Sequence, residues 1–356
     1  MKEIKVLMLG GKRCGKTTVL SSMFSSINMA LAGTDLTIDV DAETSAALNR
    51  AKSVIINKMK EFEHPLTSCE VEENPSDATR SYSFSLKRES NGKLKGSGIP
   101  FRIYDIPGEW LTDENTEKVK GLIKDCQVII IAIDTPYLFA KMTDKGYGQY
   151  HEQANKSVEI TNFFKDTLSA EDLRDRMILF VPIKCERYYH LDRALHLRQF
   201  GRRYMCEVTK AVYEGYKDLI YYLRSCEELV NRCTIAITPI LSAGGIDFIS
   251  FRWDDEANKM IAYYQAPEFV REDERGYRPK FCEQPMIYIL AYLLVQAIEA
   301  QTSSKSSFLF GKNLLTGMNQ QQMESALRTI KMKMKRNSGI SIEEDGYFFI
   351  QNPKNL

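Results

Sequence analysis

Residues 4–18 read IKVLMLGGKRCGKTT, and this stretch decides the fold. The apolar run over residues 4–9 stops at a pair of glycines, which predicts a buried β-strand. Beyond Thr17, apolar side chains recur three or four positions apart as far as Leu31, which predicts an α-helix with one buried face. The stretch therefore predicts a strand, a glycine-rich loop and a helix, in that order.

The loop satisfies the pattern G-x-x-x-x-G-K-[ST] of a phosphate-binding loop, the Walker A motif. Glycines let successive backbone N–H groups point at phosphate oxygens, and the following helix adds the positive end of its dipole. Lys16 is expected against the β and γ phosphates, and the Thr17 hydroxyl is expected to bind Mg²⁺. A plain glycine turn is the alternative. The expected phosphate-binding residues are Gly10, Gly11, Lys12, Arg13, Cys14, Gly15, Lys16, Thr17 and Thr18.

The composition excludes several classes of protein. With 356 residues, of which 44% are hydrophobic, the chain can bury a large core. Lys and Arg (48) almost balance Asp and Glu (47), so neither a nucleic-acid partner nor a membrane is expected. Eight scattered cysteines without a C-x-x-C pair, and no signal-peptide pattern, favour reduced thiols in the cytoplasm over a zinc site or disulfides.

Strands that alternate with helices predict an α/β fold with a mainly parallel sheet and helices on both faces. Continuous apolar runs over residues 127–134, 177–183 and 234–241 are typical of covered parallel strands. Residues 81–87 alternate polar with apolar and are expected to form an antiparallel hairpin with residues 100–106. The expected helices cover residues 42–62, 151–168, 191–203, 204–229 and 286–300, and a further hairpin is expected over residues 248–264.

A second motif, Asp105-Ile106-Pro107-Gly108, stands at the end of the hairpin. An acidic residue at a strand end, followed three positions later by glycine, would hold Mg²⁺ and sense the γ phosphate through a backbone N–H. Taken alone, D-x-x-G also describes common turns. A switch threonine that binds Mg²⁺ and contacts the γ phosphate is expected just before residue 81, and Thr79 is the best placed, with Ser76 and Thr67 as alternatives.

Four segments resemble, in order and context, the G1, G3, G4 and G5 motifs of Ras-like (TRAFAC-class) P-loop GTPases: residues 10–17, 105–108, 183–186 and 242–244. The chain is also similar to bacterial GTPase-like proteins of the double-GTPase kind. The resemblance implies a three-layer P-loop NTPase fold, GTP or GDP with Mg²⁺ as ligands, and slow GTP hydrolysis. It further implies a molecular switch in bacterial signalling or conflict, acting on a protein effector or co-encoded partner that the sequence does not identify.

Base recognition departs from the family's pattern, because Glu186 stands where the family has Asp. A carboxylate there can accept hydrogen bonds from the N1–H and amino groups of guanine, which adenine cannot supply. Lys184 would lie along the base, and the N–H of Ala243, after Ser242, would donate to the guanine oxygen. The alternative is a solvated strand end with residues 242–244 as a plain turn.

Catalysis departs from the pattern as well, because Glu109 follows the D-x-x-G glycine where the family often has Gln. A carboxylate can position or activate a water, but it adds negative charge near the γ phosphate, so slow hydrolysis is expected. Lys16, Glu109 and Thr79 are the expected catalytic residues. Arg13 either leans over the phosphates or faces solvent.

The expected domain arrangement is a G domain over residues 1–301 with insertions at about 34–76 and 246–283. An extension over residues 302–356 follows, with an amphipathic helix and a strand. Two other functions stay open. One is an ATP-binding ATPase or kinase, for which Arg193, Arg198, Arg202 and Arg203 could form a lid. The other is a scaffold that nucleotide stabilises and that does not hydrolyse it.

Overall fold

The architecture is known from a computed structural model. It describes residues 3–60, 66–67, 79–90, 93–111, 115–140, 150–169, 171–194, 202–225, 233–255, 259–265, 276–302, 319–338 and 349–351.

An eight-stranded sheet forms the middle layer, in the order β11-β8-β7-β6-β1-β5-β4-β2. Strands β5, β1, β6, β7 and β8 are parallel neighbours, whereas β4, β2 and β11 run antiparallel to theirs. The prediction of a mainly parallel α/β sheet is therefore confirmed. The strands are β1 (Ile4–Leu9), β2 (Leu36–Val40), β4 (Arg80–Ser90), β5 (Lys93–Asp105), β6 (Val128–Asp134), β7 (Met177–Ile183), β8 (Thr234–Ile237) and β11 (Phe349–Gln351).

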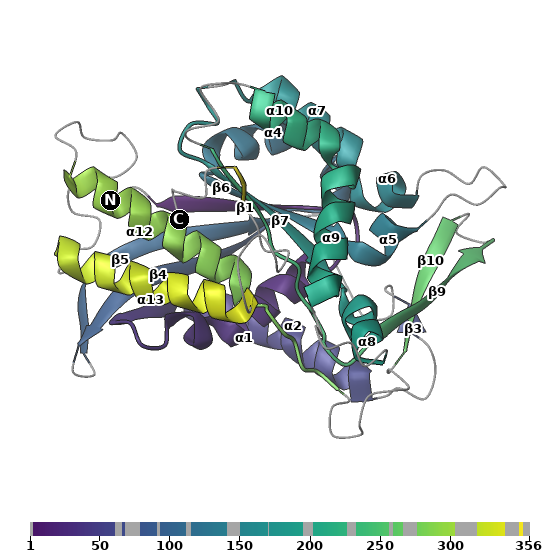
Figure 1. The fold of residues 1–356 in the computed structure, drawn as a ribbon, viewed down its shortest axis with the longest axis horizontal. Coiled ribbons are helices and arrows are strands. Elements are labelled where there is room, and N and C mark those ends of the chain that lie inside the picture. Colours follow the sequence, from purple (N-terminus) through teal and green to yellow (C-terminus); the bar gives the residue numbers. More distant parts are fainter. Residues whose placement is uncertain are drawn as a thin grey trace.

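Helices cover both faces of this sheet, because successive side chains of a strand point to opposite faces. In β1, Val6 and Met8 lie in the core that α1, α12 and α13 cover, whereas Leu7 and Leu9 lie in the core that α4, α7 and α10 cover. Figure 1 shows these two sets of helices on opposite sides of the sheet. The first set is α1 (Lys16–Leu31), α2 (Ala42–Lys60), α12 (Gln284–Thr302) and α13 (Gln320–Ser338). The second is α4 (Thr116–Asp125), α7 (Ser157–Thr167) and α10 (Lys217–Ser225). Helix α9 (Arg202–Gly215) contributes Val208 to the first core and Val212 to the second.

A small antiparallel sheet in the order β3-β10-β9 joins two distant parts of the chain. Its strands are β3 (Leu66–Thr67), β9 (Asp247–Asp254) and β10 (Lys259–Gln265). The expected hairpin over residues 248–264 is confirmed, and β3 brings the two expected insertions together. Ile55 and Met59 of α2 share an apolar cluster with Ala262 and Tyr264 of β10.

Several element boundaries differ from expectation. Strand β2 was not expected. It adds to the open edge of β4, so residues 36–40 of the first expected insertion belong to the main sheet. The helix expected over residues 204–229 is two helices, which meet at Tyr216. Helix α8 (Glu186–Ala194) starts five positions before the helix expected at residue 191, and residues 195–201 lie outside the described chain.

The expected amphipathic helix and strand near the end of the chain are present, and both are attached to the main body. Helix α13 buries Met323, Ile330 and Met334 in the core that α12 and α1 share. Strand β11 pairs with β8. Among the described residues, no helix is long and apolar enough to cross a membrane.

Candidate functional site

The carboxyl ends of β1, β5, β6 and β7 meet at one edge of the main sheet, where ligands bind in open α/β sheets. The glycine-rich loop leaves β1 there and turns into α1 through Gly15, whose φ of 106° lies in the left-handed region. Gly15 gives no side-chain cap and the first turn of α1 holds no acidic residue. The positive end of this helix therefore faces the loop.

Lys16 folds back over the loop that precedes it. Its Nζ donates to the carbonyl oxygens of Gly10 at 3.0 Å and Gly11 at 3.1 Å, and the residue is only 7% exposed. The ammonium group is thereby held inside the ring of backbone that would surround a phosphate. Cys14 and Gly15 are buried with it.

Thr17 and Asp105, the expected metal ligands, are in contact. The Thr17 hydroxyl donates to Asp105 Oδ2 at 2.9 Å, and Asp105 is 7% exposed. Burial raises the pKa of this carboxyl group, while the charges of Lys16 and Arg80 and the Thr17 hydrogen bond act in the opposite direction. A hydroxyl and a carboxylate are hard oxygen donors of the kind Mg²⁺ prefers. In the described part of the chain no three His, Cys, Asp or Glu residues gather as a metal site.

Gly108 brings the D-x-x-G motif against the loop. It begins the short 3₁₀ helix η1 (Gly108–Leu111), and a Cβ on it would lie 2.2 Å from the backbone nitrogen of Lys12. The next residue, Glu109, pairs with Lys12 at 2.5 Å. Burial raises the pKa of Glu109, but the hydrogen bond with Lys12, a backbone N–H and the charges of Lys12 and Lys16 together leave this pKa below its ordinary value. Glu109 is therefore an anchored carboxylate beside the loop.

Lys184 ties the end of β7 to the loop. Its Nζ donates to the carbonyl oxygen of Arg13 at 3.1 Å and to Asp134 Oδ2 at 2.7 Å, and it lies 5.5 Å from the centre of the Tyr264 ring. Asp134 is 2% exposed, and its other oxygen, Oδ1, is buried without a hydrogen-bond partner among the described residues. Sequence reasoning missed Asp134, although its place at the end of an apolar strand was a usable signal. No sequence pattern indicated Tyr264, which lies in the second expected insertion.

The expected base-recognition residues meet, but they bind one another. Glu186 Oε1 accepts the N–H groups of Ala243 at 2.8 Å and Gly244 at 3.0 Å, and Glu186 is 3% exposed. The Ser242 carbonyl accepts the Ser22 hydroxyl at 3.0 Å. The Ala243 N–H that was expected to face guanine is thus already bonded, so a guanine base would have to take it from Glu186.

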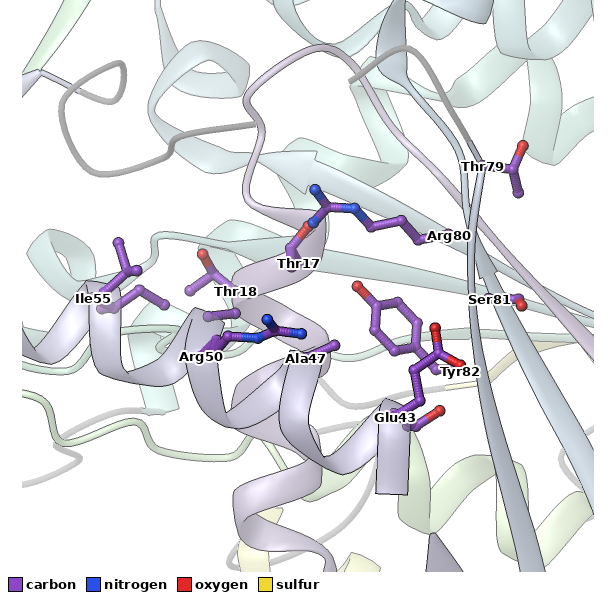
Figure 2. A pocket seen from close by; sticks show the side chains of 13 residues that line it. Thr17, Thr18, Glu43, Ala47, Arg50, Ile55, Thr79, Arg80, Ser81 and Tyr82 are labelled. Atoms are coloured by element: carbon purple, nitrogen blue, oxygen red, sulfur yellow. The ribbon is translucent and has the colours of Figure 1, made fainter. Parts of the chain in front are cut away.

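A pocket of about 650 Å³ opens beside Thr17, between α1, α2 and β4. Figure 2 shows Arg80 pointing across it toward Thr17, whereas Thr79 and Ser81 leave the strand on the other side. Thr79, the expected switch residue, therefore points away from Thr17 (Figure 2). Its role stays a prediction. Arg80 takes the position facing Thr17, and only the strand alternation with Tyr82 could have indicated it. The pocket is lined by Thr17, Thr18, Glu43, Thr44, Ala47, Arg50, Ala51, Val54, Ile55, Thr79, Arg80, Ser81 and Tyr82.

Comparison with known proteins gives a distant likeness. No protein-family model and no curated protein matches the chain. Among solved structures, the chain is similar to "LeoA bacterial dynamin GTPase from ETEC", with 12% sequence identity and a TM-score of 0.29 over 67% of this chain. The match covers 30% of that protein's chain.

Proposed function

We propose that this protein binds a nucleoside triphosphate, in the first place GTP, together with Mg²⁺. The observation that carries the proposal is the convergence of Lys16 and the Thr17–Asp105 pair where the glycine-rich loop becomes α1. Lys16 would exchange its loop carbonyls for the β and γ phosphates, and the loop N–H groups would hold the remaining oxygens. Mg²⁺, when bound, would neutralise charge between the β and γ phosphates.

Guanine as the base is supported by the four motifs that resemble Ras-like GTPases and by Lys184, which reaches the loop from β7. Glu186 and Ala243 would exchange their mutual hydrogen bond for bonds to guanine. Hydrolysis would be slow, because Glu109 is held by Lys12 rather than aimed at a water. We infer a nucleotide-controlled switch acting on a protein effector, in bacterial signalling or conflict and in the cytoplasm.

A second candidate is a nucleotide-binding protein with little base selection, such as an ATPase. The hydrogen bonds of Glu186 to the N–H groups of Ala243 and Gly244 favour this candidate, because these groups are then not available to a base. The phosphates would provide most of the binding contacts. The two candidates differ in how strongly ATP competes with GTP.

The test is competition of GTP, GDP, ATP and XTP against a fluorescent GTP analogue, with and without Mg²⁺. Lys16→Ala should weaken binding by about 100-fold or more, since a charge-assisted phosphate contact inside a loop is lost. Lys165→Ala, on the exposed side of α7, is the matched control. Native-like affinity of Lys16→Ala would refute the proposal. Glu186→Asn should shift preference from guanine toward xanthine, and no shift would favour the second candidate.

A further inference from the structure

Arg80 stands beside the expected metal ligands without being one. It is the first residue of β4 and pairs in register with Asp105 at the end of β5. Its side chain lines the same pocket as Thr17 and points toward that residue (Figure 2). The guanidinium group is thus directed toward Thr17, which with Asp105 would hold a divalent cation.

Asp105 is a buried carboxylate whose compensating charges come from two side chains, Lys16 and Arg80. Lys16 is engaged with the carbonyl oxygens of Gly10 and Gly11. Within the described chain, no ion pair joins Arg80 to any carboxylate. Its guanidinium can therefore move without breaking a salt bridge, although it would give up its interaction with the Tyr82 hydroxyl. While it stays, it offsets part of the cost of burying Asp105.

We infer that Arg80 is a built-in competitor of Mg²⁺ at the nucleotide site. In the metal-free protein its guanidinium provides positive charge near Asp105. Thr17 and Asp105 would hold Mg²⁺ in the same region, and the guanidinium would then move away from the two added positive charges. The pocket gives the displaced side chain room, and Glu43, on the α2 wall of that pocket, offers it a carboxylate. The inference rests on the proposed function and adds a regulation to it: metal and Arg80 exclude one another.

The experiment is a Mg²⁺ titration of fluorescent-nucleotide binding to the full chain, with the thermal midpoint of nucleotide-free protein as a second readout. Arg80→Ala should lower the Mg²⁺ concentration at half-maximal binding by about fivefold to tenfold, because a partly screened like charge is removed. It should also lower the thermal midpoint in EDTA. Arg80→Lys, which keeps the charge, should stay close to the native protein. Arg50→Ala, on the opposite wall of the pocket, is the matched control and should change neither readout.

If Arg80→Ala leaves the Mg²⁺ concentration at half-maximal binding unchanged, the inference is overturned, while the proposal of nucleotide binding stands. Weaker binding in EDTA together with a raised Mg²⁺ midpoint would also overturn it, because Arg80 would then be a phosphate ligand. A native chain that binds no triphosphate under any condition would refute the proposed function and the inference together. If Arg80→Ala does not fold, Arg80→Gln removes the charge while keeping most of the length, and the same outcomes apply.

Discussion

At the scale of single residues, the buried charge on Asp105 lowers the stability of the metal-free protein, whereas the proposed Mg²⁺ site needs that charge. Burial raises the pKa of this group above the ordinary value of 3.8, so the folded chain binds its proton more tightly than the unfolded chain does. The free energy of unfolding of the metal-free protein should therefore fall as pH rises from about 4 through the folded-state pKa. Glu186 and Asp134, whose pKa values burial also raises, act in the same direction.

Asp105→Asn removes this buried charge and keeps an acceptor for Thr17. We expect the metal-free variant to be more stable at pH 7 by about 1 kcal/mol, and its stability to depend less on pH. We also expect that Mg²⁺ no longer strengthens nucleotide binding to this variant. Thermal melting at pH 5 and pH 7 checks the first part, and nucleotide titration checks the second.

Asp172→Asn serves as the control. The backbone N–H of Ser169 donates a hydrogen bond to Asp172, and this bond is the largest cause of the lowered pKa of the Asp172 carboxyl group. Its stabilisation is present above its ordinary pKa and is lost on acidification. This variant should therefore lose stability at pH 7. A destabilised Asp105→Asn variant at pH 7 would contradict the assignment of an unfavourable buried charge.

The site residues divide into those that local sequence could indicate and those it could not. Lys16, Thr17 and Asp105 could be predicted as site residues because a phosphate-binding loop requires fixed residue types at fixed spacings. In the structure Thr17 contacts Asp105, and Lys16 bonds the carbonyl oxygens of Gly10 and Gly11 beside them. The partners of Glu186 were not foreseen. Its two hydrogen bonds to residues 243 and 244 depend on how a loop 57 positions away closes, and no local pattern encodes that.

At the scale of elements, α13 shows how a charged helix can be part of the core. Its Met323, Ile330 and Met334 are buried, while Met332 on the outer side is 53% exposed. The periodicity of apolar residues predicted this helix well, because burial of one face follows a 3.6-residue repeat. The same kind of pattern could not reveal β2, a short edge strand whose pairing depends on β4.

Ile330→Ala should lower the free energy of unfolding by about 2–4 kcal/mol, the usual result of emptying a buried aliphatic site. Met332→Ala, two positions away, should change it by less than about 0.5 kcal/mol. Urea denaturation followed by circular dichroism measures both. Equal effects of the two substitutions would mean that α13 does not pack on α12 in solution.

At the scale of the whole molecule, segments far apart in sequence are joined beside the site, where Ile55 lines the pocket and the Tyr264 ring lies near Lys184. The β3-β10-β9 sheet and the cluster of Ile55, Met59, Ala262 and Tyr264 connect the part of the chain before β4 with the part after β8. The hairpin itself was predictable from alternation, but its partner was not, because the pairing of β3 with β10 is set by the closed fold.

Ile55→Ala and Tyr264→Ala should therefore be non-additive. Each should cost about 2–4 kcal/mol, and the double variant should cost less than the sum by about 0.5–1 kcal/mol or more, because both truncations enlarge one cluster. A double-mutant cycle in urea provides the measurement. Strict additivity would show that the two segments do not share a cluster.

Strand β11 pairs along the outer side of β8, which is otherwise the last parallel strand of the main sheet. An uncovered strand of this kind offers its backbone to any other chain with a free edge. A variant that lacks residues 349–356 should therefore keep the core under β8 but expose the edge of this strand. We expect such a variant to aggregate through the exposed edge rather than to unfold.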